Sequence, residues 1–167
     1  QTIPAPPRSV QAIAQPRNPL PAEEASARAS KFSFIVYGDT RGRRDGVAVQ
    51  YEHGMVVDGM LAAIKRLEST EYPVKFVLQS GDAVVDGRNA DQWNKSFNGL
   101  INRLTAEAGV PYFLVPGNHD LTTSDDAASP QRQQGLRNYL QALANLIPPD
   151  GNPRRLTGYP TFSFGYG

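Results

Sequence analysis

Three short apolar runs in this sequence each lead into a glycine that is followed by aspartate or asparagine. The runs cover residues 32–37, 74–78 and 112–115, and the pairs after them are Gly38-Asp39, Gly81-Asp82 and Gly117-Asn118. Nearly continuous apolar runs of this length are typical of strands that are buried on both faces of a sheet. The sequence therefore predicts three such strands, each with a sharp polar turn at its carboxyl end.

Helical patterns fill the gaps between the runs. The expected helices cover about 54–69, 93–104 and 130–147, and an alternating pattern at 161–166 predicts a fourth strand. Gly109 is placed to stop the second helix, and Ser129, followed by proline, predicts the N-cap of the third. Trp93 lies on an apolar helical stripe and is predicted to be structural. The order β-α-β-α-β-α-β indicates an α/β fold with parallel pairing and right-handed crossovers.

Composition excludes several classes of protein. The 167 residues are 40% hydrophobic and 20% charged, which is ordinary for a globular chain. The net charge of +1 does not indicate a basic surface that would bind nucleic acid. The absence of cysteine excludes disulfides, thiolate zinc sites and a cysteine nucleophile. No run approaches the ~18 apolar residues that cross a bilayer, so no transmembrane segment is expected.

Residues 1–30 differ in composition from residues 31–167. Six of the 14 prolines lie in this first segment, which has no apolar period. This composition predicts an extended, polyproline-like or disordered arm that acts as a spacer or packs on the body. A docking peptide for a proline-recognising partner is the alternative. The opening at Gln1 is typical of a processed, exported chain, so we expect a periplasmic or secreted location, with the cytoplasm as the alternative.

The polar residues after the three runs favour a metal site. In parallel α/β sheets, ligands bind outside the carboxyl ends of the strands. Asp39, Asp82 and Asn118 would bring hard oxygen ligands to that edge. His119 adds an imidazole, and such a set suits divalent Mn, Fe or Zn. A single Gly-Asp pair more often starts a turn or caps a helix, so the hypothesis depends on the recurrence after three strands.

Three blocks of this sequence carry a resemblance to a known family. Residues 81–87 (GDAVVDG) and 117–120 (GNHD) resemble the GDxxxxG and GNH[DE] blocks of the calcineurin-like metallophosphoesterases. Residues 38–41 (GDTR) stand in the place of that family's first block. The blocks occur in the family's order, and each gap between them holds one expected helix. The resemblance extends over residues 32–167.

The resemblance implies a phosphoester hydrolase with two divalent metal ions and a layered α/β sandwich fold. By analogy, Asp39 would bind the first metal, Asp82 would bridge both, and Asn118 would bind the second. His119 would lie beside the phosphate of the substrate and help to neutralise or protonate the leaving oxygen. Asp120 would orient His119 from behind. The substrate would be a phosphomonoester or phosphodiester, hydrolysed by a metal-activated water.

Arg41 and His53 mark a departure from the family pattern. Most members place a metal-binding histidine where this sequence has Arg41, and a guanidinium cannot bind a metal. Arg41 could instead hold a phosphate oxygen of the substrate, next to Asn118 and His119. His53 stands near the start of the following helix, where it is either a replacement ligand or an exposed residue beside a helix N-terminus.

The small number of histidines marks a second departure. The family completes its site with histidines from its C-terminal half, but this sequence has only His53 and His119. Residues 161–167 resemble the segment that opens that half, so we expect the N-terminal portion of the domain. A continuation of the chain, or a separate chain, would then supply the remaining ligands and cover the sheet edge.

Three other functions remain as alternatives. A catalytically impaired module that binds metal or phosphate on the same fold fits Arg41 and the missing histidines. A phospho-aspartyl enzyme with Asp39 as nucleophile is disfavoured, because it requires an acid at the position of Arg41. Nucleotide-binding folds are also disfavoured, because no glycine-rich phosphate loop follows any expected strand.

Overall fold

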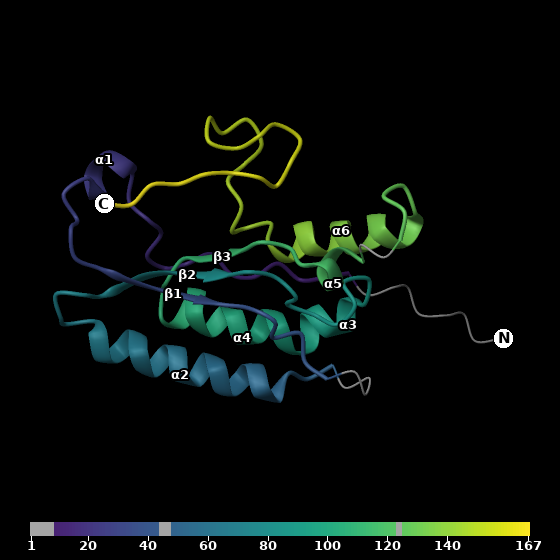
Figure 1. Ribbon diagram of the computed structural model, residues 1–167, viewed down its shortest axis with the longest axis horizontal. Helices are drawn as coiled ribbons and strands as arrows, with labels where there is room; N and C mark the ends of the chain where they lie inside the picture. The colour runs from purple at the N-terminus through teal and green to yellow at the C-terminus, as the bar shows by residue number, and fades with distance from the viewer. Residues whose placement is uncertain (1–8, 44–47, 123–124) are drawn as a thin grey trace.

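Three parallel strands form the centre of the molecule (Figure 1). The computed structural model describes residues 9–43, 48–122 and 125–167. The strands are β1 (Ser33–Tyr37), β2 (Val74–Gln79) and β3 (Tyr112–Leu114), paired in the order β1-β2-β3. The predicted α/β class with parallel pairing is therefore confirmed.

The register of the sheet aligns the three strand ends. Tyr37 pairs with Gln79, and Gln79 pairs with Leu114, so the last residues of β1, β2 and β3 form one row. The predicted pairs Gly38-Asp39, Gly81-Asp82 and Gly117-Asn118 follow shortly after this row, the third one after Val115 and Pro116. They therefore leave the sheet at the same edge, as the rule for parallel sheets requires.

Helices connect the strands and lie mainly along one face of the sheet (Figure 1). After β1 comes α2 (Tyr51–Leu67), and after β2 a continuous helix of mixed geometry. Its parts are α3 (Ala90–Gln92), the π-helical η1 (Trp93–Phe97), α4 (Asn98–Asn102) and the π-helical η2 (Arg103–Glu107). After β3 come α5 (Asn118–Leu121) and α6 (Pro130–Ala142). In the part of the chain that the structure describes, no helix is long and apolar enough to span a membrane.

The three predicted helices are confirmed, with different ends: the first spans 51–67 and the second 90–107. Ser129 caps α6 by accepting a hydrogen bond from the Arg132 amide at 3.2 Å. Gly109 has a φ of 78° just after η2, as expected of a C-terminal stop. The third helix ends at Ala142 rather than at 147. The chain continues to Ile147 in hydrogen-bonded turns, which still bury Leu143.

Trp93 belongs to the core, as predicted. Its ring is fully buried, packs edge-on against Phe97 at 5.4 Å and donates a hydrogen bond to the Gly87 carbonyl at 3.0 Å. On α2 the buried side chains include His53, Val57 and Met60. The core thus forms between the sheet and these two helices.

The proline-rich segment packs on this core from residue 9 onward. Val10 and Ile13 are buried, and the Ile13 amide donates to the Ala142 carbonyl at 2.8 Å. Asn145 also donates to the Ile13 carbonyl, at 2.9 Å. The segment then forms the short α1 (Glu23–Ser26). Its prolines at positions 4, 6 and 7 lie outside the described residues.

The second face of the sheet differs from the prediction. Phe34 and Val36 of β1 are 51% and 61% exposed, so this strand is not buried on both faces. The predicted strand at 161–166 is also absent from the assigned strands, with one isolated bridge between Arg155 and Phe162. Its rings pack on this face instead: Phe164 stacks on Phe113 at 4.3 Å, and Tyr166 packs edge-on against Phe32 at 4.9 Å. Side-chain packing thus replaces backbone pairing in this segment.

Candidate functional site

The loops after β1 and β2 hold two aspartates in an unusual backbone conformation. Asp39 has a φ of 56° and Asp82 a φ of 54°, both in the left-handed region that residues with a β-carbon rarely adopt. The Asp39 amide donates to the Gly81 carbonyl at 3.1 Å, which joins the two loops. Such a conformation costs energy and persists only where surrounding contacts maintain it. Strained residues of this kind are concentrated at functional sites.

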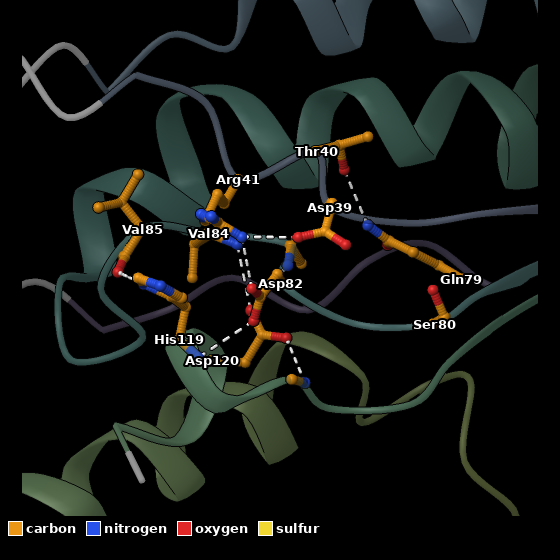
Figure 2. Close-up of polar contacts among 12 residues, drawn as sticks. Asp39, Thr40, Arg41, Gln79, Ser80, Asp82, Val84, Val85, His119 and Asp120 are labelled. Carbon is orange, nitrogen blue, oxygen red and sulfur yellow. Dashed lines mark hydrogen bonds and ion pairs between the residues drawn. The ribbon is translucent and has the colours of Figure 1, made fainter. Parts of the chain in front are cut away.

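Arg41 connects the two aspartates (Figure 2). Its Nη1 atom lies 2.7 Å from Oδ1 of Asp39 and 2.5 Å from Oδ2 of Asp82. The Asp82 side chain is only 12% exposed, that of Arg41 is 27% exposed, and that of Asp39 is 78% exposed. The two carboxylates thus converge on a single nitrogen of the Arg41 guanidinium, at the carboxyl ends of β1 and β2.

The loop after β3 approaches Asp82 from the other side. The His119 amide donates to Oδ1 of Asp82 at 3.1 Å, so both oxygens of this carboxylate have partners. A β-carbon at Gly117 would lie 2.2 Å from the same oxygen, which leaves room for glycine only. Asn118 is exposed at the start of α5. The structure therefore brings Asp39 and Asp82 together through Arg41. Asn118 lies after β3, at the first position of α5.

Asp120 holds two of these loops together. Its Oδ1 accepts from the amides of Ala83 and Val84 at 2.9 and 3.1 Å, and its Oδ2 accepts from the Gly117 amide at 2.8 Å. Burial raises the pKa of this carboxyl to about 6, although the three amides act in the opposite direction. The Asp120 carboxylate was expected to orient the His119 ring. In the structure, both of its oxygens accept hydrogen bonds from backbone amides instead.

The His119 ring is oriented by a backbone carbonyl. Its Nδ1 donates to the Val85 carbonyl at 2.7 Å, as Figure 2 shows. In the neutral ring, Nε2 is then the nitrogen that can accept a proton. His119 lines a cavity of about 430 Å³. The other lining residues are Val85, Asp86, Arg88, Asn118 and Thr122.

His53 lies inside the fold rather than on the surface of α2. It is 2% exposed; its Nδ1 donates to Oε1 of Gln50 at 2.8 Å and its Nε2 lies 3.1 Å from the Tyr37 hydroxyl. Burial lowers its pKa to about 4, so the ring is neutral at pH 7. It lines a cavity of about 370 Å³ together with Asp39 and Thr40, but both ring nitrogens have protein partners.

Sequence reasoning missed a buried polar chain that leads from His53 to the site. The Tyr37 hydroxyl lies 2.7 Å from that of Tyr112, and Tyr112 donates to Gln79. The single hydrogen of the Tyr37 hydroxyl can be donated either to Tyr112 or to Nε2 of His53. Gln79 in turn donates to the Thr40 hydroxyl at 2.8 Å, next to Asp39 (Figure 2). Tyr37 ends the first apolar run, Gln79 follows the second and Tyr112 begins the third. Only the register shows that these side chains meet.

These features define a class of protein: an α/β protein with an oxygen-rich site at the carboxyl ends of parallel strands. The family model for calcineurin-like phosphoesterases matches residues 32–164, which covers most of the chain, so the protein belongs to that family. No curated protein and no solved structure matches the chain in the corresponding comparisons. The resemblance of the three sequence blocks is therefore confirmed at the level of the family.

The donor set fits a divalent cation in part. Asp39 and Asp82 direct one oxygen each at the position of the Arg41 guanidinium, which stands in for a cation between two hard ligands. Asn118 could add an amide oxygen nearby. Within residues 9–43, 48–122 and 125–167, however, no group of three or more His, Cys, Asp or Glu side chains could hold a metal ion. The described residues thus offer two carboxylates and one amide that could bind a cation, and no larger set of ligands.

Proposed function

We propose that this protein hydrolyses a phosphoester with the help of two divalent metal ions of the Mn, Fe or Zn type. The convergence of two carboxylates from adjacent strand ends on one cationic atom carries this proposal. A protein site seldom directs two carboxylates at one point unless a cation neutralises them. Membership of the calcineurin-like phosphoesterase family supports the same chemistry.

The carboxylates would form the metal-binding part of the site. Asp39 would hold the first metal, Asp82 would bridge both, and Asn118 would hold the second. When bound, the metals would supply an activated water and would neutralise charge on the phosphoryl oxygens. The Asp120 contacts with the amides of Ala83 and Gly117 would keep the two loops at a fixed separation.

His119 and Arg41 would act on the substrate. The Nδ1–H of His119 is committed to the Val85 carbonyl, so Nε2 would take up a proton and deliver it to the leaving oxygen. Arg41 would hold non-bridging phosphate oxygens through two N–H donors. Arg41 lies on the loop after β1 and His119 on the short helix α5 after β3, so the sheet fixes where both segments begin.

We also propose that further polypeptide, from the same or a separate chain, completes the site and covers the open face of the sheet. Phe34 and Val36, two residues apart on β1, are each more than half exposed on that face. Contiguous exposed apolar side chains usually mark a contact surface. The additional segment would bring the ligands that the described residues lack.

A catalytically impaired binding module on the same fold is the second candidate. Arg41 favours it, because the guanidinium fills the position between Asp39 and Asp82 and cannot bind a metal. Such a module would bind phosphate or metal without turning over an ester.

Hydrolysis of para-nitrophenyl phosphate and its bis-ester by the full-length protein, with and without Mn²⁺, distinguishes the two candidates. We expect Mn²⁺-dependent turnover of at least one ester, and loss of that turnover in Asp82→Asn. Asp58→Asn is the matched control, because Asp58 is an exposed aspartate of α2 that pairs with Arg103. Metal binding without turnover of either ester would favour the binding module.

A further inference from the structure

We propose that Arg41 is an internal competitor for the metal: its guanidinium bridges Asp39 and Asp82 until a divalent cation displaces it, and it then turns to the phosphate of the substrate. This inference rests on the proposed function, because it assigns two successive partners to one side chain of the same site. It would make the phosphate-binding group available only after the metal is bound.

The contacts of Arg41 support competition rather than coexistence. A single atom, Nη1, contacts both carboxylates, at 2.7 and 2.5 Å. A metal shared by these carboxylates would need the same space, since its oxygen ligands lie at about 2.0–2.2 Å. Two positive charges cannot occupy one position, so binding of the metal requires Arg41 to leave.

The Arg41 side chain can leave the two carboxylates without a change in the backbone. The Arg41 contacts are both made by the tip of its side chain, so rotation about the side-chain bonds is sufficient to break them. The backbone of Asp39 meanwhile remains tied to the Gly81 carbonyl. The carboxylates can therefore stay in place while the guanidinium moves.

The Arg41 bridge also stabilises the Asp82 carboxylate in the absence of metal. Asp82 is largely buried, and its negative charge would be unfavourable there without a positive partner. Arg41 supplies that partner, and the His119 amide supplies a donor to the other oxygen. The bridge thus stabilises the metal-free site and lowers its affinity for metal. Only molecules in which Arg41 has left the carboxylates can bind the metal, so the apparent affinity falls in proportion to the fraction of such molecules.

Mn²⁺ titration of the full-length protein, followed by electron paramagnetic resonance, tests the proposal with Arg41→Gln. We expect Arg41→Gln to bind Mn²⁺ about tenfold more tightly than the wild type, since a charge-assisted contact no longer has to be broken. Arg43→Gln is the matched control: it removes the same charge two residues away, from a side chain that contacts Glu52. Its effect should be no more than about twofold, as for other exposed charges.

A second titration tests the destination of the guanidinium. Inorganic phosphate should bind more weakly to Mn²⁺-loaded Arg41→Gln than to the loaded wild type, because the variant lacks the donor. Equal phosphate affinity would overturn this half of the proposal. If Arg41→Gln does not fold without metal, Arg41→Lys replaces it. It should also bind Mn²⁺ more tightly than the wild type, because the lysine side chain is one bond shorter and its ammonium does not reach the position of Nη1 between the two carboxylates.

The outcomes separate this proposal from the proposed function. Equal Mn²⁺ affinity of the wild type and the Arg41 variant would overturn the competition and leave the metal site intact. Equal tightening in the Arg41 and Arg43 variants would show a general charge effect and would also overturn it. Failure of all the proteins to bind Mn²⁺ would overturn the proposed function and the competition together. Tightening confined to Arg41 variants would support both.

Discussion

Asp120 illustrates how a single buried carboxylate can hold the loops of a candidate site together. Three backbone amides from two loops donate to it, and these loops carry Asp82 and Asn118. A charged acceptor satisfies such a set of converging amides better than a neutral one does. Its neighbour His119 depends on the same loops, since the His119 amide donates to Asp82 and its ring donates to Val85.

Asp120→Asn should therefore destabilise the fold. The asparagine can present one oxygen, but its NH₂ group would face an amide N–H that previously had an acceptor. We expect a loss of about 1–3 kcal/mol in the free energy of unfolding, as for other buried groups left unsatisfied. Urea unfolding measures it, with Asp58→Asn as the exposed control. Equal stability of the two variants would contradict the assigned role.

His53 makes stability depend on pH. Burial lowers its pKa to about 4 from 6.5, so between these values the unfolded chain binds a proton that the folded chain does not. The stability contributed by neutral His53 is present above pH 6.5 and is lost as the pH falls towards 4, by up to about 3 kcal/mol.

Comparison with His53→Gln isolates this effect. Asp120, whose pKa is raised to about 6, changes stability in the opposite direction over part of the same range, but it does so in both proteins. The wild type should lose its advantage over His53→Gln as the pH is lowered from 7 to 4.5 in urea unfolding. A difference between the proteins that is independent of pH would refute the buried neutral state.

At the scale of the elements, the ends of the strands were predictable and the contacts between them were not. The apolar runs locate β1, β2 and β3 because strands of a parallel sheet are rich in apolar residues, although Phe34 and Val36 of β1 are exposed on one side. The chain from Tyr37 through Tyr112 to Gln79 depends on the register, which no single run determines. The bridge from Arg41 to two carboxylates likewise depends on the left-handed backbone at Asp39 and Asp82.

The position of α6 depends on a hydrogen bond to the edge strand. The Tyr139 hydroxyl is buried and donates to the Leu114 carbonyl of β3 at 2.7 Å. Tyr139→Phe should lower the free energy of unfolding by about 1–2 kcal/mol, because that carbonyl loses its donor. Tyr159→Phe, at an exposed position, is the control and should have no measurable effect. A neutral Tyr139→Phe would mean that packing alone positions the helix.

At the scale of the whole molecule, the two faces of the sheet are unequal. Helices cover one face, and the C-terminal segment lies over part of the other (Figure 1). Phe164 and Tyr166 pack there against Phe113 and Phe32, while Val36 remains 61% exposed. The sequence predicted burial on both sides because it shows which residues are apolar but not what covers them.

A charge on the open face tests whether further polypeptide covers it. Val36→Lys should destabilise the full-length protein by about 2 kcal/mol or more if that face is covered, since an unpaired charge would be buried. On an uncovered face the same substitution should stay within about 0.5 kcal/mol. Thermal unfolding of the full-length protein gives the comparison, and a change in the smaller range would argue against the proposed cover.

The central claim is that Asp39 and Asp82 form a divalent metal site from which Arg41 must withdraw. Anomalous diffraction from crystals of the full-length protein grown with Mn²⁺ tests it most directly. We predict an anomalous peak within ligand distance of both carboxylates, with the Arg41 guanidinium turned away from them. Crystals saturated with Mn²⁺ in which Arg41 still bridges Asp39 and Asp82, with no anomalous peak between these carboxylates, would contradict it.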